Sequence, residues 1–210
     1  MKPWLHVLAG TALTALCLPA FAREWRFQVL LDGSPVGHHH FILNENGADK
    51  SITSEARFNV KLLFISAYRY VHDARERWRG NCLTSLSART DDDGDVVTVE
   101  AEQQGELTNI VASPGKRVSV TGCVMSFAYW NPEMLRQTRL LNANNGLYET
   151  VRITAVGEER ITVRGKPVQA VHYRISGSEY PIEFWYGSDQ SWLGLEAIVE
   201  GGRKLRYVLQ

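Results

Sequence analysis

Three consecutive histidines, His38, His39 and His40, have the residue type and spacing that best suit metal binding. Alternate side chains of a β-strand share a face, so His38 and His40 would point to one side and His39 to the other. Two imidazoles at this spacing can bind zinc or copper if the fold supplies a third ligand, such as His72 or His172. The bland alternative is an outer strand face that carries polar residues. A metal site at His38 and His40 is therefore an alternative hypothesis, and otherwise we expect no cofactor.

The usual motifs of nucleophilic catalysis give no support for an enzyme. The sequence contains neither G-x-S-x-G nor H-E-x-x-H, and no glycine-rich phosphate loop leads from a strand pattern into a helix pattern. Folding can gather scattered catalytic residues, so an envelope hydrolase or a metal-dependent enzyme that uses His38 and His40 remains the alternative function. The missing motifs favour a protein that is not an enzyme, and no residue is assigned a catalytic role.

Aromatic residues are the more informative feature. The candidate ligand-binding residues are Tyr68, Tyr70, Trp78, Trp130 and Trp185. On the concave face of a curved sheet, such side chains would bind an amphipathic or lipid-like ligand. Alternatively, they fill a large core. The leading hypothesis is non-enzymatic binding of such a ligand or of an envelope partner, and a purely structural interaction module is a third possibility.

Period-two alternation of apolar residues must position these candidates. Trp25, Phe27, Val29 and Leu31 share one strand face, and the turn-forming residues 32–35 then start a hairpin. Similar short alternating segments recur to the end of the chain and predict about a dozen strands. We expect an all-β protein, with a large curved antiparallel sheet or half-barrel.

One segment has the pattern of a helix instead of a strand. Pro132 suits a first helical position, Asn131 can cap it, and Met134 and Leu141 fall on one helical face. The sequence therefore predicts one short helix over residues 132–141, which would cover an open side of the sheet.

The first residues predict export. Lys2 precedes an apolar stretch at 5–18, and Pro19 and the small-x-small pattern of residues 20–22 follow. The stretch is shorter than the roughly 20 residues of a membrane-spanning helix. Leu16, before Cys17, does not suit a lipoprotein cleavage site. We expect a signal peptide over residues 1–22, one β domain over residues 23–210, and a periplasmic or secreted location.

Charge and cysteine count bound the partners and the redox state. Equal numbers of basic and acidic residues, 23 of each, argue against a nucleic-acid partner. No later segment is apolar enough to span a membrane. Loss of the signal peptide leaves Cys82 and Cys123, and an even count in an oxidising compartment predicts a disulfide. The alternative is two buried free thiols.

Several short segments resemble a family of exported bacterial proteins of unknown function. They are Leu31-Asp32-Gly33 with Val36-Gly37-His38-His39, Phe58-Asn59-Val60-Lys61, Glu76-Arg77-Trp78 with Cys82-Leu83, Thr90-Asp91-Asp92, and Ala128-Tyr129-Trp130-Asn131. The late segment Phe184-Trp185-Tyr186 is similar to a second such family. The resemblance implies a periplasmic, all-β protein whose layout is similar to the half-barrels that carry lipoproteins or lipids. It supports the pairing of Cys82 with Cys123 and implies no catalytic residue.

Overall fold

The computed structural model describes residues 21–62, 65–178 and 180–210. Most of the predicted signal peptide lies outside these residues, so its cleavage remains a prediction. Within the described ranges, no helix has the length and apolar character needed to cross a membrane.

The chain is built almost entirely of β-strands. In order they are β1 (Phe21–Leu31), β2 (Ser34–Asn46), β3 (Asp49–Leu62), β4 (Ile65–Arg79), β5 (Cys82–Asp92), β6 (Asp95–Gln104), β7 (Leu107–Ala112), β8 (Lys116–Thr121), β9 (Arg139–Leu141), β10 (Tyr148–Thr150), β11 (Arg152–Val163), β12 (Lys166–Ser176), β13 (Ile182–Gly187), β14 (Trp192–Val199) and β15 (Arg203–Leu209). Two 3-10 helices, η1 (Pro132–Arg136) and η2 (Glu200–Gly202), interrupt the described strands.

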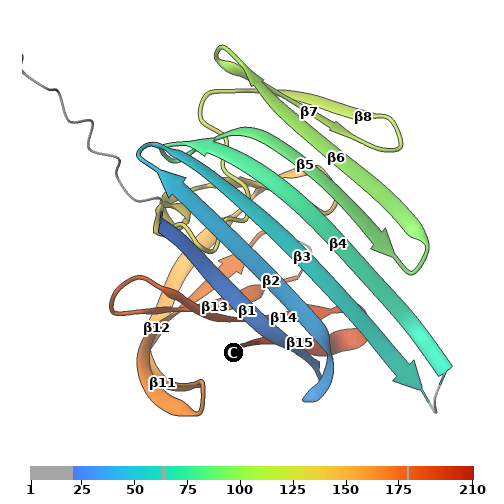
Figure 1. Cartoon of the computed structure of the whole chain (residues 1–210), viewed down its shortest axis with the longest axis vertical. Coiled ribbons are helices and arrows are strands. Elements are labelled where there is room, and N and C mark those ends of the chain that lie inside the picture. The colour runs from blue at the N-terminus through green and yellow to red at the C-terminus, as the bar shows by residue number, and fades with distance from the viewer. Residues whose placement is uncertain (1–20, 63–64, 179) are drawn as a thin grey trace, which may run out of the picture.

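Thirteen strands form one antiparallel sheet in the order β11-β12-β13-β14-β15-β1-β2-β3-β4-β5-β6-β7-β8. The sheet consists of two meanders, β11–β15 and β1–β8, joined where β15 pairs with β1. The sheet is strongly curved, as Figure 1 shows: the orange and red strands run across the direction of β2–β6. The predicted large curved antiparallel sheet is confirmed.

Alternation along the strands separates a buried concave face from an exposed face. In β1, Trp25, Phe27, Val29 and Leu31 are buried as predicted, whereas Arg26 and Gln28, which alternate with them, are exposed. The predicted hairpin after Leu31 also forms, since β2 begins at Ser34.

The segment 122–151, which we call the covering segment, packs on the concave face of the sheet. Its residues Met125, Trp130 and Leu140 belong to the same core as Phe27 of β1 and Trp192 of β14. The short strands β9 and β10 pair with each other, apart from the main sheet. This segment therefore supplies much of the apolar surface that the concave face needs in order to be buried.

The predicted helix over residues 132–141 is wrong in length and type. A 3-10 helix covers only Pro132–Arg136, with Asn131 as its N-cap as expected. The rest of the predicted helix contributes strand β9, whose Leu140 and Leu141 are fully buried. The backbone N–H of Leu141 donates to the Met125 carbonyl at 2.8 Å. Tertiary pairing with Met125 and β10 thus overrides the local helical pattern.

Cys82 and Cys123 form a disulfide across a sequence separation of 41 residues, as predicted. Cys82 begins β5, and Cys123 lies at the start of the segment 122–151. The backbone beside the bond is also paired, because the Leu83 N–H donates to the Val124 carbonyl at 2.8 Å. The disulfide therefore attaches the covering segment to the sheet.

We expect removal of the disulfide to destabilise the protein substantially. Closing a loop of this length lowers the entropy of the unfolded chain and stabilises the fold by about 4 kcal/mol. The double variant Cys82→Ser/Cys123→Ser should lose about that much free energy of unfolding in urea titrations. Reduced wild-type protein is the matched control and should give the same value. A loss under about 1 kcal/mol would contradict the prediction.

Candidate ligand-binding cavity

A cavity of about 260 Å³ lies between the concave face of the sheet and the segment 122–151. Its lining combines residues of β2, β3, β4, β13, β14 and β15 with residues of the segment 122–151. The aromatic members of the lining are Phe41, Tyr70, Phe127, Tyr129, Trp130, Trp192 and Tyr207. The cavity therefore has aromatic walls drawn from both ends of the chain.

The aromatic side chains of the wall support one another. Trp192 stacks on Tyr129 with ring centroids 5.2 Å apart, and it meets Phe41 edge to face at 5.1 Å. Behind them, Phe27 packs against Trp192 at 4.4 Å. Such contacts hold the rings in defined orientations, so this part of the wall is preformed.

His39 of β2 faces the cavity and lies between two hydroxyl groups. Its Nε2 is 2.6 Å from Ser54 Oγ on β3, and its Nδ1 is 3.2 Å from the Tyr207 hydroxyl on β15. Burial, assisted by the nearby imidazole of His72, lowers the pKa of His39 well below its usual 6.5. The ring is therefore neutral near pH 7.

His72 of β4 is a second buried imidazole beside the first. The two ring centroids are 6.3 Å apart, and His72 Nδ1 is hydrogen-bonded to Thr90 Oγ1 at 2.9 Å. Burial lowers the pKa of His72 to about 4. Both histidines of the lining thus offer hydrogen bonds without charge at neutral pH.

Glu76 of β4 places a carboxyl group in the wall. Its oxygens accept hydrogen bonds from Ser126 Oγ at 3.1 Å and from Trp78 Nε1 at 2.9 Å. Burial raises the pKa of Glu76 to about 7, and these two hydrogen bonds only partly oppose the rise. This carboxyl group therefore changes charge within the neutral pH range.

The predicted ligand-binding residues are divided between the cavity and other places. Tyr70 and Trp130 line the cavity. Trp78 is buried in the core, perpendicular to Trp130 with ring centroids 5.3 Å apart, and Tyr68 is 36% exposed. Trp185 lies on the opposite face of the sheet, because it alternates with the buried residues Phe184 and Tyr186 of β13.

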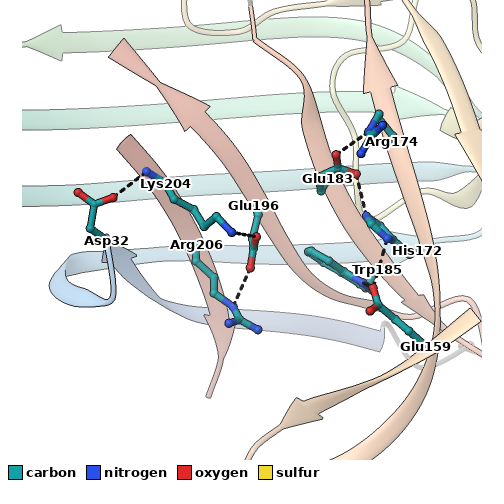
Figure 2. A network of polar contacts seen from close by, with 9 residues as sticks. All are labelled: Asp32, Glu159, His172, Arg174, Glu183, Trp185, Glu196, Lys204 and Arg206. Atoms are coloured by element: carbon teal, nitrogen blue, oxygen red, sulfur yellow. Dashed lines mark hydrogen bonds and ion pairs between the residues drawn. The ribbon is translucent and has the colours of Figure 1, made fainter. Parts of the chain in front are cut away.

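On that opposite face, Trp185 belongs to a network of polar contacts (Figure 2). Its indole stacks on His172 with centroids 4.8 Å apart. The His172 imidazole lies between Glu183, at 2.7 Å, and Glu159, at 3.2 Å. The indole N–H of Trp185 also donates to Glu159. These contacts tie β11, β12 and β13 together on the outer surface.

The histidines singled out for metal binding are not gathered into one site. His38 is exposed, and His40, on the same outward face, is hydrogen-bonded to Glu24. His72 lies on the concave side with His39, whereas His172 belongs to the network around Trp185. In the part of the chain that the structure describes, no group of three or more His, Cys, Asp or Glu residues is arranged to hold a metal.

Sequence reasoning missed several polar residues of the cavity: His39, Ser54, Glu76, Glu149 and Tyr207. The available signal was the alternation of side chains along a strand. His39 points to the opposite side from His38 and His40, and Glu76 lies on the same side as Trp78. This alternation predicts the face of the sheet on which a side chain lies, but not which side chains of other strands lie beside it.

A larger groove of about 610 Å³ lies near the turn between β2 and β3 and is lined by residues of β2–β6. Its lining includes Glu45, Asp49, Lys50, Arg77 and Glu102. These charged residues are typical of a solvated surface. The smaller cavity, with its aromatic walls, is therefore the stronger candidate for a binding site.

We expect Glu76 to make the free energy of unfolding depend on pH. Its folded pKa of about 7 exceeds the usual 4.5, so stability should fall as the pH rises between these values and stay level above them. This difference in pKa corresponds to about 3 kcal/mol. Urea titrations at pH 5 and pH 8 should show that wild type loses more free energy of unfolding between these pH values than Glu76→Gln does. The variant keeps both buried histidines, so their titration contributes equally to the two proteins. Parallel pH profiles would contradict the assignment.

Comparisons with known proteins agree with this fold. No curated protein matches the chain. A crystal structure of a "beta-barrel-like protein of domain of unknown function DUF1849" from Brucella abortus superposes with a TM-score of 0.62 and 11% identity, covering 89% of this chain and 94% of that one. This similarity shows a shared fold. The model of the family described as a domain of unknown function, DUF6134, matches residues 27–210, and the chain therefore belongs to that family.

Proposed function

We propose that this protein binds a small amphipathic molecule in the concave cavity and does so without catalysing a reaction. The observation that carries the proposal is the cavity itself, in which aromatic walls surround a few polar groups. Ligand sites commonly combine a mainly apolar lining with a small number of placed polar groups. The apolar body of the ligand would contact Phe41, Tyr129 and Trp192.

The polar end of the ligand would be recognised by hydrogen bonds on the β2–β4 and β15 side. Burial raises the pKa values of Tyr70 and Tyr207, so both phenols keep their protons at neutral pH. With the neutral imidazole of His39, they supply hydrogen-bond donors and acceptors that need no counter-ion. A volume of about 260 Å³ suits a small ligand, or one end of a longer one that extends out of the cavity.

The proposed place of action is outside the cytoplasm. The disulfide Cys82–Cys123 supports this location, since such bonds persist in oxidising compartments. We propose that residues 1–22 direct export and are removed, and that residues 23–210 act as a single β domain.

Filling the cavity should weaken binding of an apolar probe. Ala74 of β4 and Ala197 of β14 lie in different meanders of the sheet, and both line the cavity. A leucine at either position would therefore occupy space that the ligand needs. We expect Ala74→Leu and Ala197→Leu to weaken binding of the neutral dye N-phenyl-1-naphthylamine at least tenfold, measured by fluorescence titration.

The matched control is Ala48→Leu, which adds the same side chain in the exposed turn between β2 and β3. It should leave dye binding unchanged. Urea titrations of all three variants establish whether each remains folded. Full dye binding by folded Ala74→Leu and Ala197→Leu proteins would reject the cavity as the ligand site.

Hydrolysis is the second candidate function, and one contact favours it. The 2.6 Å approach of Ser54 Oγ to His39 Nε2 is the geometry of a serine nucleophile and its general base, with Tyr207 on the other ring nitrogen. This candidate rests on the His39–Ser54 pair, whereas the alternative predicted from the sequence used His38 and His40.

If this pair is catalytic, we expect the protein to hydrolyse short-chain esters. Purified protein should hydrolyse p-nitrophenyl butyrate, and Ser54→Ala should lower the rate at least a hundredfold. Ser51→Ala, an exposed serine on the same strand, is the matched control. Equal rates for wild type and Ser54→Ala would eliminate this function and leave non-enzymatic binding.

A further inference from the structure

The charged side chains of the cavity are all of one sign. Glu76 and Glu149 contribute carboxyl groups to the lining, and among the described lining residues there is no lysine or arginine. Glu76 accepts hydrogen bonds from Ser126 and Trp78, and Glu149 accepts one from Asn142 Nδ2 at 2.8 Å. These donors are neutral, so the negative charge of the wall has no cationic counterpart within it.

Two cations near the cavity, Lys50 and Arg57, are engaged elsewhere. Lys50 lies over the Trp130 ring at 5.4 Å and pairs with Glu45 at 3.8 Å. Arg57, beneath His39 and His72, pairs with Asp73 at 2.6 Å on the outer face. Neither Lys50 nor Arg57 lines the cavity, so neither is placed to receive an anionic head group there.

The aromatic walls add attraction for positive charge. The face of an aromatic ring carries negative potential, and ammonium groups bind over such faces, most strongly in sites shielded from water. Tyr129, Trp130 and Trp192 present rings to the same cavity as the two carboxyl groups. The contact of Lys50 with the Trp130 ring shows that one of these rings accommodates an ammonium group.

We propose that the ligand carries an alkylammonium group, which the cavity holds between its aromatic rings and the carboxylates of Glu76 and Glu149. The inference deepens the proposed function and rests on it. An anionic head would lose its hydration in the cavity without meeting a cation, which is strongly unfavourable. An ammonium head would instead compensate carboxylates that have no lysine or arginine beside them among the described lining residues. The ammonium group can belong to a free amine or to the head of a zwitterionic lipid.

Three amphiphiles with the same decyl chain test the charge preference. At pH 8, where Glu76 is ionised, decyltrimethylammonium should displace bound N-phenyl-1-naphthylamine at a concentration at least tenfold lower than decyl sulfate does, with all three kept below their micelle concentrations. Decylphosphocholine separates the two sources. Displacement equal to that by decyltrimethylammonium assigns a zwitterionic lipid head, and weaker displacement assigns a free amine.

Variants of the carboxyl groups locate the preference. Glu76→Gln and Glu149→Gln should each reduce the ratio of cation to anion affinity at least threefold, with the ratio measured in each variant by displacement of its own bound dye. The matched control, Glu159→Gln, removes a carboxylate of the outer network in Figure 2 and should leave the ratio unchanged. The variants test the proposal through two independent positions, so the loss of fold in one of them leaves the other as the test.

The outcomes distinguish the two levels of the proposal. Equal or tighter binding of decyl sulfate would overturn the ammonium inference, as would a cation preference that survives in both glutamine variants. In either case, amphiphile binding would still support the proposed function. If calorimetry detects binding of neither the dye nor any of the three amphiphiles, the proposed function fails, and the ammonium inference fails with it.

Discussion

Strand β15 pairs with strand β1, from Phe27 opposite Leu209 to Leu31 opposite Leu205, and this seam joins two meanders that are each continuous in sequence. All other strand pairs of the main sheet are between neighbours along the chain. The seam brings Tyr207 of β15 within 3.2 Å of His39 on β2. Without it, the aromatic wall of β14 and the polar wall of β2–β4 would have no fixed relation. The cavity thus depends on one contact between the chain's two ends.

A curved sheet of this kind has a concave face that must be covered. The two meanders supply apolar side chains along that face, and the segment 122–151 supplies the surface that packs on them. Its attachment through the disulfide and the Leu83–Val124 hydrogen bond holds the cover close to β5. The cover contacts the sheet through Met125 and Leu140 but leaves space between Tyr129 and Tyr70. The cavity is therefore a gap in an otherwise packed interface, bordered by a segment whose position is covalently constrained.

The polar residues around this gap follow one physical rule, which is that buried titratable groups avoid unpaired charge. Burial keeps the imidazoles of His39 and His72 neutral and shifts Glu76 toward its protonated form. Each of the three also has a hydrogen-bond partner in the structure. On the outer face, by contrast, Glu196 pairs with Lys204 and Arg206, as charged residues in contact with water do (Figure 2). Polar residues around the cavity are thus held by hydrogen bonds with their charge suppressed, whereas those on the outer face form ion pairs.

Most strands of the main sheet, the faces of their side chains and the cysteine pair could be predicted from the amino-acid sequence. Alternation in β1 is a local property of neighbouring residues, so it could be recognised without knowledge of the fold. The tertiary structure alone decided which inward side chains meet. His39, Ser54 and Tyr207 come from three strands, and their contact depends on strand order and curvature, which no local period encodes. The same reason explains the failed helix at residues 132–141: the local pattern favoured it, but pairing of Leu141 with Met125 and β10 buries two adjacent leucines that a single helical face could not bury as well.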